Sequence, residues 1–442
     1  MAPAFRFVVP SLIGVFVFLT PIAWNGQLTI GIGIVTGWIR TALADVDLEI
    51  VILLLVVTSL LTVAGSALKS EWIRRRPLLR ELFDVPPVWL ILRLLGTAFG
   101  LVYYLQIGPG LLRSEQIGGA IFIDIAFNVV TVYIGACLLL PLLTDFGFME
   151  FIGTLARPFF RRLFQLPGRA AIDATASLIG AASVGLLITI SQYERGFYTA
   201  REASVIAMNF SIVSIPFSLV VAAAAGIEDL FISWYATVIV ICLIAAFVTP
   251  RLPPLSGKID HYYEAAGRQI HEEHQENLSL LSEAWQKAVA RAKDSPGPGA
   301  FLISGIRNLM FFLFAVVAAA MAIATIAALL TFHTPIFRFL GAALVPLLEF
   351  AQIPAASVAA PGLFAGFMDQ YMPAVVAGGI DSELTSFVLA GLSVAQLVYM
   401  SEVGVIVLRS KLPVSFGDLA LVFLLRTAIA LPLLIAAAHL LT

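Results

Sequence analysis

Long apolar runs alternate with short polar segments along most of the chain. A helix needs about 20 apolar residues to cross about 30 Å of hydrocarbon, and nine runs meet this need. They are Phe5–Ile22, Glu49–Lys69, Val88–Gln106, Ile121–Leu143, Ala200–Ala225, Ile232–Thr249, Phe301–Thr331, Ser382–Leu408 and Phe416–Leu440. Gln27–Ile39 is shorter and rich in glycine, so whether it crosses stays open. The pattern predicts an all-α, polytopic membrane protein with about nine transmembrane helices.

Two further apolar stretches, Ala170–Ser191 and Ser357–Ile380, contain residues that interrupt a helix. The interrupting residues are Asp173, Gly180, Ser183 and Gly185 in the first stretch and Pro361, Gly366, Asp369, Gln370, Pro373 and Gly378 in the second. Irregular backbone at membrane depth persists only where protein or a water-filled cavity surrounds it. We therefore expect two re-entrant helical hairpins, with kinked full spans as the alternative.

One hydrophilic stretch, Arg251–Gly299, divides the chain. Leu278, Leu281, Trp285 and Ala288 recur within it at the spacing of an amphipathic helix. The expected organisation is N-terminal membrane helices (1–110), a first repeat (118–250), a charged cytoplasmic linker (251–299) and a second repeat (300–442).

Arginine clusters indicate the orientation. Loops on the cytoplasmic side collect Arg and Lys. The two clusters are Arg74, Arg75, Arg76 and Arg80, and Arg157, Arg161, Arg162 and Arg169. Counting spans from these clusters predicts a protein of the bacterial inner membrane with its N-terminus in the cytoplasm and its C-terminus outside. The first hairpin then enters from the cytoplasm and the second from outside.

The two halves share an order of parts: span, interfacial segment, hairpin, span, span. Residues of the first half match residues of the second, and the difference in residue number changes slightly from element to element. It is 188 for Gly153 and Pro158 with Gly341 and Pro346, and 186 for Gly180 and Ser183 with Gly366 and Asp369. It is 182 for Ser204, Ser211 and Ser214 with Ser386, Ser393 and Gln396. The first span of one repeat runs toward the cytoplasm, and the first span of the other runs away from it. Such inverted repeats are typical of secondary transporters, whose sites lie near the midplane at broken helices.

Composition narrows the class further. The chain is 60% hydrophobic and only 12% charged, with a mean hydropathy of +0.98, whereas soluble domains are about 25% charged. A net charge of -2 provides no basic field for nucleic acid. Cys137 and Cys242 lie in apolar runs, so neither a disulfide scaffold nor a metal site is expected. The expected partners are the lipid bilayer and a small polar solute.

Two acidic residues are candidates for ion coupling. An ionisable residue inside a membrane segment marks a functional site by default. Asp369 lies in the second hairpin, within GFMDQYMP, and is expected to bind a coupling H⁺ or Na⁺; the alternative is a cap at the hairpin tip. Glu402 is expected to share this role or to pair with Arg409. No resident cofactor or catalytic residue is predicted, so the protein is not expected to be an enzyme.

Uncharged polar residues are candidates for solute binding. Gln370 and Tyr371 adjoin Asp369, and Ser393, Gln396 and Tyr399 recur at i, i+3, i+6 along one side of the following helix. The predicted solute-binding residues are Ser183, Asn209, Ser214, Gln370, Tyr371 and Gln396. The alternative is that such residues, Ser211 included, only bond their own backbone or join helices.

The segment FAGFMDQYMPAVVAGG-IDSELTSFVLAGLSVAQLVYMSEVGVIVLRSKLP resembles the Gate (nucleoside-recognition) domain of YjiH-like bacterial membrane proteins. The order of nine spans, the charged central loop and the earlier half-motif IGAASVGLLITISQYERGFYTAREASVIAMNFSIVSIP together fit the same family over nearly the whole chain. The resemblance implies an inner-membrane, transporter-like protein, a homo-oligomer as in concentrative nucleoside carriers, and recurrent hairpin positions at Asp369, Tyr371 and Pro373. It does not imply nucleoside specificity, because ferrous-iron transporters share the module.

The resulting hypothesis is a secondary-active transporter that moves a small polar solute, such as a nucleoside, nucleobase or similar metabolite, by alternating access. The alternative is a non-transport membrane scaffold of the spore-maturation type.

Overall fold

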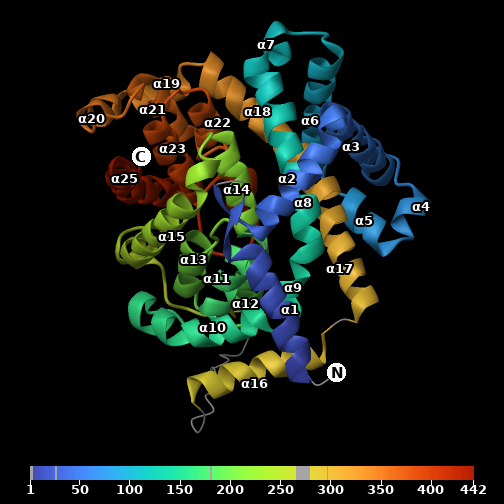
Figure 1. Ribbon diagram of the computed structural model, residues 1–442, viewed down its shortest axis with the longest axis vertical. Coiled ribbons are helices and arrows are strands. Elements are labelled where there is room, and N and C mark those ends of the chain that lie inside the picture. The colour runs from blue at the N-terminus through green and yellow to red at the C-terminus, as the bar shows by residue number, and fades with distance from the viewer. Residues whose placement is uncertain (1–2, 25–26, 180–181, 265–278, 296) are drawn as a thin grey trace.

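The chain folds into a bundle of helices (Figure 1). The computed structural model describes residues 3–24, 27–179, 182–264, 279–295 and 297–442. Within these ranges the one sheet is a small antiparallel hairpin of β1 (Pro21–Trp24) and β2 (Gln27–Ile30). The predicted all-α, polytopic membrane class is therefore confirmed.

Seven helical segments of the described chain are long and apolar enough to cross a membrane. They are Gly31–Ala67, Pro87–Leu105, Ile117–Thr144, Glu228–Arg251, Gly299–His333, Glu383–Gly404 and Phe416–Leu441. Each overlaps one predicted span. Of the stretch that the sequence left open, Gln27–Ile30 forms β2 and the rest begins the first segment, which joins α2 (Gly31–Leu43) to α3 (Asp47–Thr62).

The other two predicted spans do not form continuous crossings. Phe5–Ile22 forms α1 (Pro3–Phe18), which is about 24 Å long at 1.5 Å per residue, and the chain then turns into β1. Ala200–Ala225 is divided into two separate helices. Hydropathy alone missed both features, because the β-strand and the interruption are as apolar as the helices beside them.

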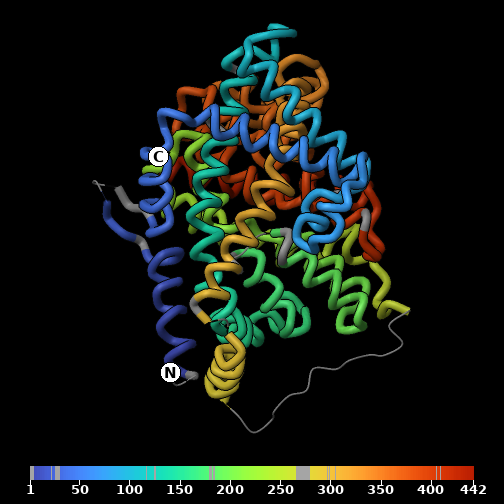
Figure 2. Tube along the Cα trace, turned by 90° about the vertical axis from the view of Figure 1, so that its right-hand side faces the viewer, coloured from blue at the N-terminus to red at the C-terminus, as the bar shows by residue number. Residues whose placement is uncertain are grey.

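Both predicted hairpins are present. Hairpin 1 consists of α11 (Ala170–Ile179) and α12 (Ala182–Glu194), and hairpin 2 of α21 (Ala356–Ala365) and α22 (Met372–Gly378). α10 (Phe148–Phe159) packs on hairpin 1, and α19 (Ile336–Ala342) packs on hairpin 2. The N-terminus and α10 lie at one end of the bundle and α19 lies toward the other (Figure 1, Figure 2). The hairpins therefore approach the centre from opposite ends.

The remaining helices follow the same order in both halves. The first half contains α8 (Ala126–Leu139), α9 (Pro141–Thr144), α13 (Ala200–Asn209), α14 (Ile215–Ala224) and α15 (Phe231–Val248). The second contains α17 (Pro298–Phe311), α18 (Ala318–His333), α20 (Val345–Phe350), α23 (Glu383–Ala395), α24 (Val405–Arg409) and α25 (Phe416–Leu441). The N-terminal part adds α4 (Glu71–Arg74), α5 (Pro77–Phe83), α6 (Pro87–Leu105) and α7 (Gly110–Arg113).

The repeats align differently from the sequence match in one place. α13 ends at Asn209 and α23 ends at Ala395, an offset of 186. The match of serines in the sequence gave an offset of 182, which differs from 186 by four residues, or about one helical turn. Small polar residues recur along both helices, so matching by residue type slipped by a turn. The offset of the helix ends equals the offset of the two hairpins.

The charged linker forms an amphipathic helix, α16 (Leu280–Lys293), as predicted, but a different face is buried. Ala284, Ala288 and Ala292 pack against α10 and α1. Leu281 is 60% exposed and Trp285 is 42% exposed. Small alanines allow the backbones to approach closely, while Trp285 lies at the margin of the contact, with its ring 5.4 Å from that of Phe7 in α1. Leu278 lies outside the described residues.

Candidate functional site

Two helices in the middle of the bundle are broken along their length. Five non-helical residues, 210–214, separate α13 from α14. The other helix stops as α23 at Ala395 and resumes as the π-helical turn η10 (Met400–Gly404) and α24. Backbone groups at such ends have no partner within their own helix. Both breaks therefore leave polar backbone in the protein interior.

Local sequence accounts for the first break, and a strained residue marks the second. Pro216 lies in the first turn of α14, where its missing N–H costs no helical hydrogen bond. Ser214 precedes that helix in an extended conformation, as a residue at an N-cap does. In the second break Leu397 has a φ of +58°, which costs a leucine about 1–2 kcal/mol. Strain of this kind is concentrated at functional sites.

The tip of hairpin 2, residues 366–371, is bound to the second break. The backbone N–H of Met400 donates to the carbonyl oxygen of Phe367 at 2.8 Å, and that of Ser401 donates to Met368 at 3.1 Å. The tip thus provides acceptors for the first amides of η10. Hairpin 2 and the broken helix are joined into one unit.

Asp369 lies at this tip and is buried. Its Oδ1 accepts the backbone N–H of Tyr371 at 2.9 Å, and the side chain of Ser401 lies close to the same carboxyl group. Glu402 is close enough to interact with it electrostatically. The bond from the Tyr371 N–H, two positions ahead, is an Asx-type turn bond. The N-cap of α22 is Tyr371, which has no side-chain capping bond, so Asp369 is not the helix cap that the sequence left as an alternative. Asp369 also lies beside a second acidic residue.

Two buried amides near Asp369 are incompletely paired. Gln396 Nε2 donates to the carbonyl oxygen of Leu363 at 2.8 Å and to Thr427 Oγ1 at 2.9 Å, while its Oε1 has no partner in the described chain. Gln370 Nε2 likewise has none there. Leaving a buried polar group unpaired costs about 1–3 kcal/mol. These atoms are therefore suited to bind a ligand.

The first repeat contributes to the same place. Tyr133 of α8 lies close to Ser214 and close enough to Glu402 and Tyr399 to interact with them electrostatically. The Tyr399 hydroxyl donates to Glu402 Oε2 at 3.0 Å. We define the central polar cluster as Tyr133, Ser214, Asp369, Gln370, Gln396, Tyr399 and Glu402. It combines side chains of both halves of the chain.

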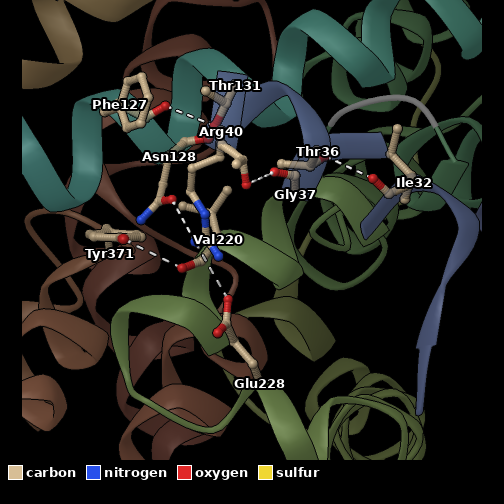
Figure 3. Close-up of polar contacts among 11 residues, drawn as sticks. Ile32, Thr36, Gly37, Arg40, Phe127, Asn128, Thr131, Val220, Glu228 and Tyr371 are labelled. Atoms are coloured by element: carbon tan, nitrogen blue, oxygen red, sulfur yellow. Dashed lines mark hydrogen bonds and ion pairs between the residues drawn. The ribbon is translucent and has the colours of Figure 1, made fainter. Parts of the chain in front are cut away.

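Tyr371 contacts α14 (Figure 3). Its hydroxyl donates to the carbonyl oxygen of Val220 across 3.4 Å. In the same view Arg40 of α2 donates to Asn128 of α8 at 3.2 Å and pairs with Glu228 at 3.7 Å. Hairpin 2 is thereby attached to the first repeat, and the chain after α14 is attached to the N-terminal helices.

Arg426 was not predicted from the sequence as a residue of the site. It lies ten residues into the 26-residue α25 and is fully buried. An arginine at the centre of a membrane helix costs about 2.5–3.5 kcal/mol. Its Nε donates to the carbonyl oxygen of Ala395 at 2.9 Å, and its Nη1 donates to Asn209 Oδ1 at 2.8 Å. A lone arginine in the run LVFLLRTAIALPLL was the available signal.

The amide of Asn209 is used within the protein. Besides Arg426, its Oδ1 accepts the Thr249 hydroxyl at 2.5 Å, and its Nδ2 donates to the carbonyl oxygen of Val205 at 3.2 Å. Asn209 is thus placed at the first break, outside the central polar cluster. Its contacts fix the end of α13.

Hairpin 1 carries a buried acid at its base. Asp173 Oδ2 accepts from Thr189 Oγ1 and from the Tyr198 hydroxyl, both at 2.9 Å. These bonds join α11, α12 and the segment that leads to α13. The side chain of Ser183 lies outside the described residues, so its predicted role stays a prediction.

Three polar residues differ from their predicted arrangement. Ser393, Gln396 and Tyr399 do not share a helix face, because α23 ends at Ala395. Ser393 donates to the carbonyl oxygen of Gln370 instead. Ser211 donates to the carbonyl oxygen of Ala207 at 2.8 Å, the backbone bond that the sequence left as the alternative.

Acidic, histidine and cysteine side chains do not gather in threes as a metal site would require, within the part of the chain that the structure describes. The side chain of Arg409 is outside that part, so its pairing with Glu402 stays a prediction.

These features define a polytopic membrane protein with a buried polar centre between two hairpins. The family model described as Gate, nucleoside recognition, matches residues 126–228, which run from α8 through hairpin 1 to the end of the first broken helix. An uncharacterized protein of Alkalihalophilus pseudofirmus is 44% identical over 434 residues, covering 98% of this chain and 94% of that protein. The chain belongs to the family of that protein, and the resemblance to Gate-domain membrane proteins is confirmed.

Among solved structures the chain is similar to a variant of CNTnw in the state called intermediate 1. The TM-score is 0.42 and the identity 14%, with 100% of this chain and 99% of the other covered.

Proposed function

We propose that the protein is a secondary-active carrier that moves a small polar solute by alternating access. The observation that carries this proposal is that both hairpins contact both broken helices, and that the buried, incompletely paired amides of Gln370 and Gln396 lie at the contact of hairpin 2 with the second break. In carriers built from inverted repeats, solute and ion bind at such broken helices. The Gate match makes nucleosides and nucleobases the first solutes to test.

The cluster residues have distinct proposed roles. The amides of Gln370 and Gln396 bond donors and acceptors of the solute, and Ser214 and Ser183 are further solute-binding residues. Asp369 and Glu402 hold the coupling cation or proton, since two neighbouring carboxyl groups bind positive charge more readily than one. Tyr371 and Asn209 position the tip and the first break through the contacts described above.

The wider setting completes the proposal. The protein is a homo-oligomeric carrier of the bacterial inner membrane rather than an enzyme, and it needs no resident cofactor. Its N-terminus is cytoplasmic and its C-terminus is outside. Residues 118–250 and 300–442 are the two repeats, and 251–299 is the cytoplasmic linker.

Solute binding is tested by thermal unfolding of the purified protein in detergent with a panel of nucleosides and nucleobases. A solute that binds the folded state at 100 times its Kd stabilises it by about 2.7 kcal/mol, which raises the unfolding temperature. If none of the panel changes this temperature and none is taken up by proteoliposomes, the scaffold alternative replaces the carrier.

Ion coupling is tested with Asp369→Asn. The variant keeps the shape of the side chain and loses its charge, so gradient-driven uptake should be abolished at normal expression. Glu349→Gln is the matched control, because this glutamate is exposed on α20 and its loss should leave uptake unchanged. Uptake by Asp369→Asn at the wild-type rate would refute the role.

A further inference from the structure

Two broken helices end at the same arginine. Asn209 is the last residue of α13 and Ala395 is the last residue of α23. The Arg426 guanidinium donates to the side chain of the first and to the carbonyl oxygen of the second. The C-terminal end of a helix carries a partial charge of about −0.5. One full positive charge therefore lies between two partly negative helix ends.

The neighbours of this guanidinium are neutral. Arg426 takes part in none of the ion pairs formed by the described residues. Its Nη2 is buried without a hydrogen-bond partner among them, and the Cys242 thiol lies beside it. The positive charge of Arg426 is therefore balanced by the two helix ends, through the Asn209 oxygen and the Ala395 carbonyl, and not by a carboxylate of the described residues.

This position has a known use in carriers of the same architecture. Unwound carbonyls and the C-terminal ends of half-helices coordinate the coupling Na⁺ or H⁺ there. Na⁺ needs oxygen ligands. The oxygens that Arg426 and Asn209 bring together at the two helix ends are Asn209 Oδ1, the Ala395 carbonyl and Thr249 Oγ1. The first two already accept from Arg426, and the third donates to Asn209.

We propose that Arg426 is a fixed internal cation that takes the place of a bound Na⁺ between the two broken helices, so that the carrier needs no Na⁺ there. The inference rests on the proposed carrier function, because only a carrier has a coupling ion. Of the two coupling ions that the sequence left open, it favours the proton, held at Asp369 and Glu402.

The test uses Na⁺ as the probe and no solute, so its failure is distinguishable from failure of the carrier proposal. Thermal unfolding of the full-length protein is followed in NaCl, KCl and choline chloride at equal ionic strength. The wild type should unfold at the same temperature in all three salts. Arg426→Ala should unfold at a lower temperature, and NaCl or low millimolar guanidinium should raise it saturably, because either cation can enter the vacated place.

Arg93→Ala is the matched control. Arg93 is also buried and donates to carbonyl oxygens of Leu82 and Ala315, but it does not lie between two broken helices. Its variant should be destabilised without a Na⁺ response. Arg426→Ser, which also removes most of the side chain and vacates the place, serves if Arg426→Ala does not fold.

Two results would overturn the proposal. The first is a saturable, Na⁺-specific stabilisation of the wild type. The second is a folded Arg426→Ala or Arg426→Ser protein whose unfolding temperature responds to no cation, which would make Arg426 a packing residue only. If neither variant folds, the wild-type comparison of Na⁺ with K⁺ decides alone.

Discussion

Gly366 sets how closely the tip of hairpin 2 approaches Gln396. A Cβ at this position would lie 2.2 Å from Gln396 Oε1, and the glutamine cannot retreat without breaking its bonds to Leu363 and Thr427. We predict that Gly366→Ala destabilises the protein by about 1–3 kcal/mol, as overpacking of an interior does, and weakens any solute-dependent stabilisation. Thermal unfolding with and without solute measures both effects.

Gly37→Ala is the control for this substitution. Gly37 lies inside α2, and an added Cβ would meet no atom within 4 Å. Replacing glycine by alanine within a helix stabilises by about 0.5–1 kcal/mol. Equal unfolding temperatures for the two variants would contradict the close contact at Gly366.

The two glutamines allow structure and binding to be separated. Gln396→Met removes the donor of two hydrogen bonds and should cost about 1–3 kcal/mol. Gln370→Met removes an Nε2 that has no partner in the described chain, so its unfolding temperature should stay near that of the wild type. The stabilisation by solute should nevertheless disappear. A Gln370→Met protein that retains the full solute response would exclude Gln370 from the site.

Individual residues were predictable where they are unusual for their surroundings. Asp369 and Gln370 stand out because polar groups are costly inside an apolar hairpin. Arg426 is equally unusual, but it lies in an unbroken helix outside the hairpins, and only the fold shows that two other helices end there. Tyr133 gives no signal, since a tyrosine in an apolar span is common.

At the scale of elements, hydropathy predicted the hairpins and missed the break between α13 and α14. Residues 210–214 are FSIVS, nearly as apolar as the flanking helices. The prolines of hairpin 2 can be recognised because glycine, Asp369 and Gln370 lie beside them, whereas Pro216 has only serines nearby, which are common in membrane helices. The second break has no proline and depends on Leu397, whose left-handed backbone cannot be read from the residue type.

The linker helix α16 depends on a charge pair with α10. Arg157 Nη1 donates to Glu283 Oε1 at 2.7 Å, and Lys287 lies 2.8 Å from the same oxygen. Hydrogen bonding from Arg157, supported by Lys287, holds the pKa of Glu283 down at about 2, against an ordinary 4.5, although burial opposes this. The stabilisation is thus fully present above about pH 4.5 and is lost as the pH falls toward 2.

We therefore predict that Glu283→Gln lowers the unfolding temperature at pH 7, by an amount that corresponds to about 1.5–3 kcal/mol for charged hydrogen bonds. The gap between wild type and variant should narrow as the pH falls below about 4.5. Glu81→Gln is the control, because its pair with Arg307 is exposed and such pairs contribute about 0–1 kcal/mol. A gap that stays constant to pH 3 would show that Glu283 acts through packing instead.

At the scale of the whole molecule, the order of elements was predictable from charge and hydropathy, because arginine clusters and spans are long-range patterns that survive local errors. The exact alignment of the repeats was not, since it depends on where helices end. The offset of 186 shared by the hairpins and the helix ends shows that each hairpin and the following broken helix keep one spacing.

Orientation is the prediction that involves the complete chain. From α16 to the C-terminal residue, the chain passes through the segment of α17 and α18, the broken helix of α23 and α24, and α25. Three crossings are predicted to put Asp294 and Thr442 on opposite sides of the membrane, and the arginine clusters predict that Asp294 is on the cytoplasmic side.

An impermeant maleimide should therefore label Thr442→Cys in spheroplasts and label Asp294→Cys only after permeabilisation. The wild type is the blank, because Cys137 and Cys242 are buried. If both variants are labelled from the same side, the number of crossings between them is even and the predicted topology is wrong. The hairpins would then not enter from opposite sides, and the carrier proposal depends on that arrangement.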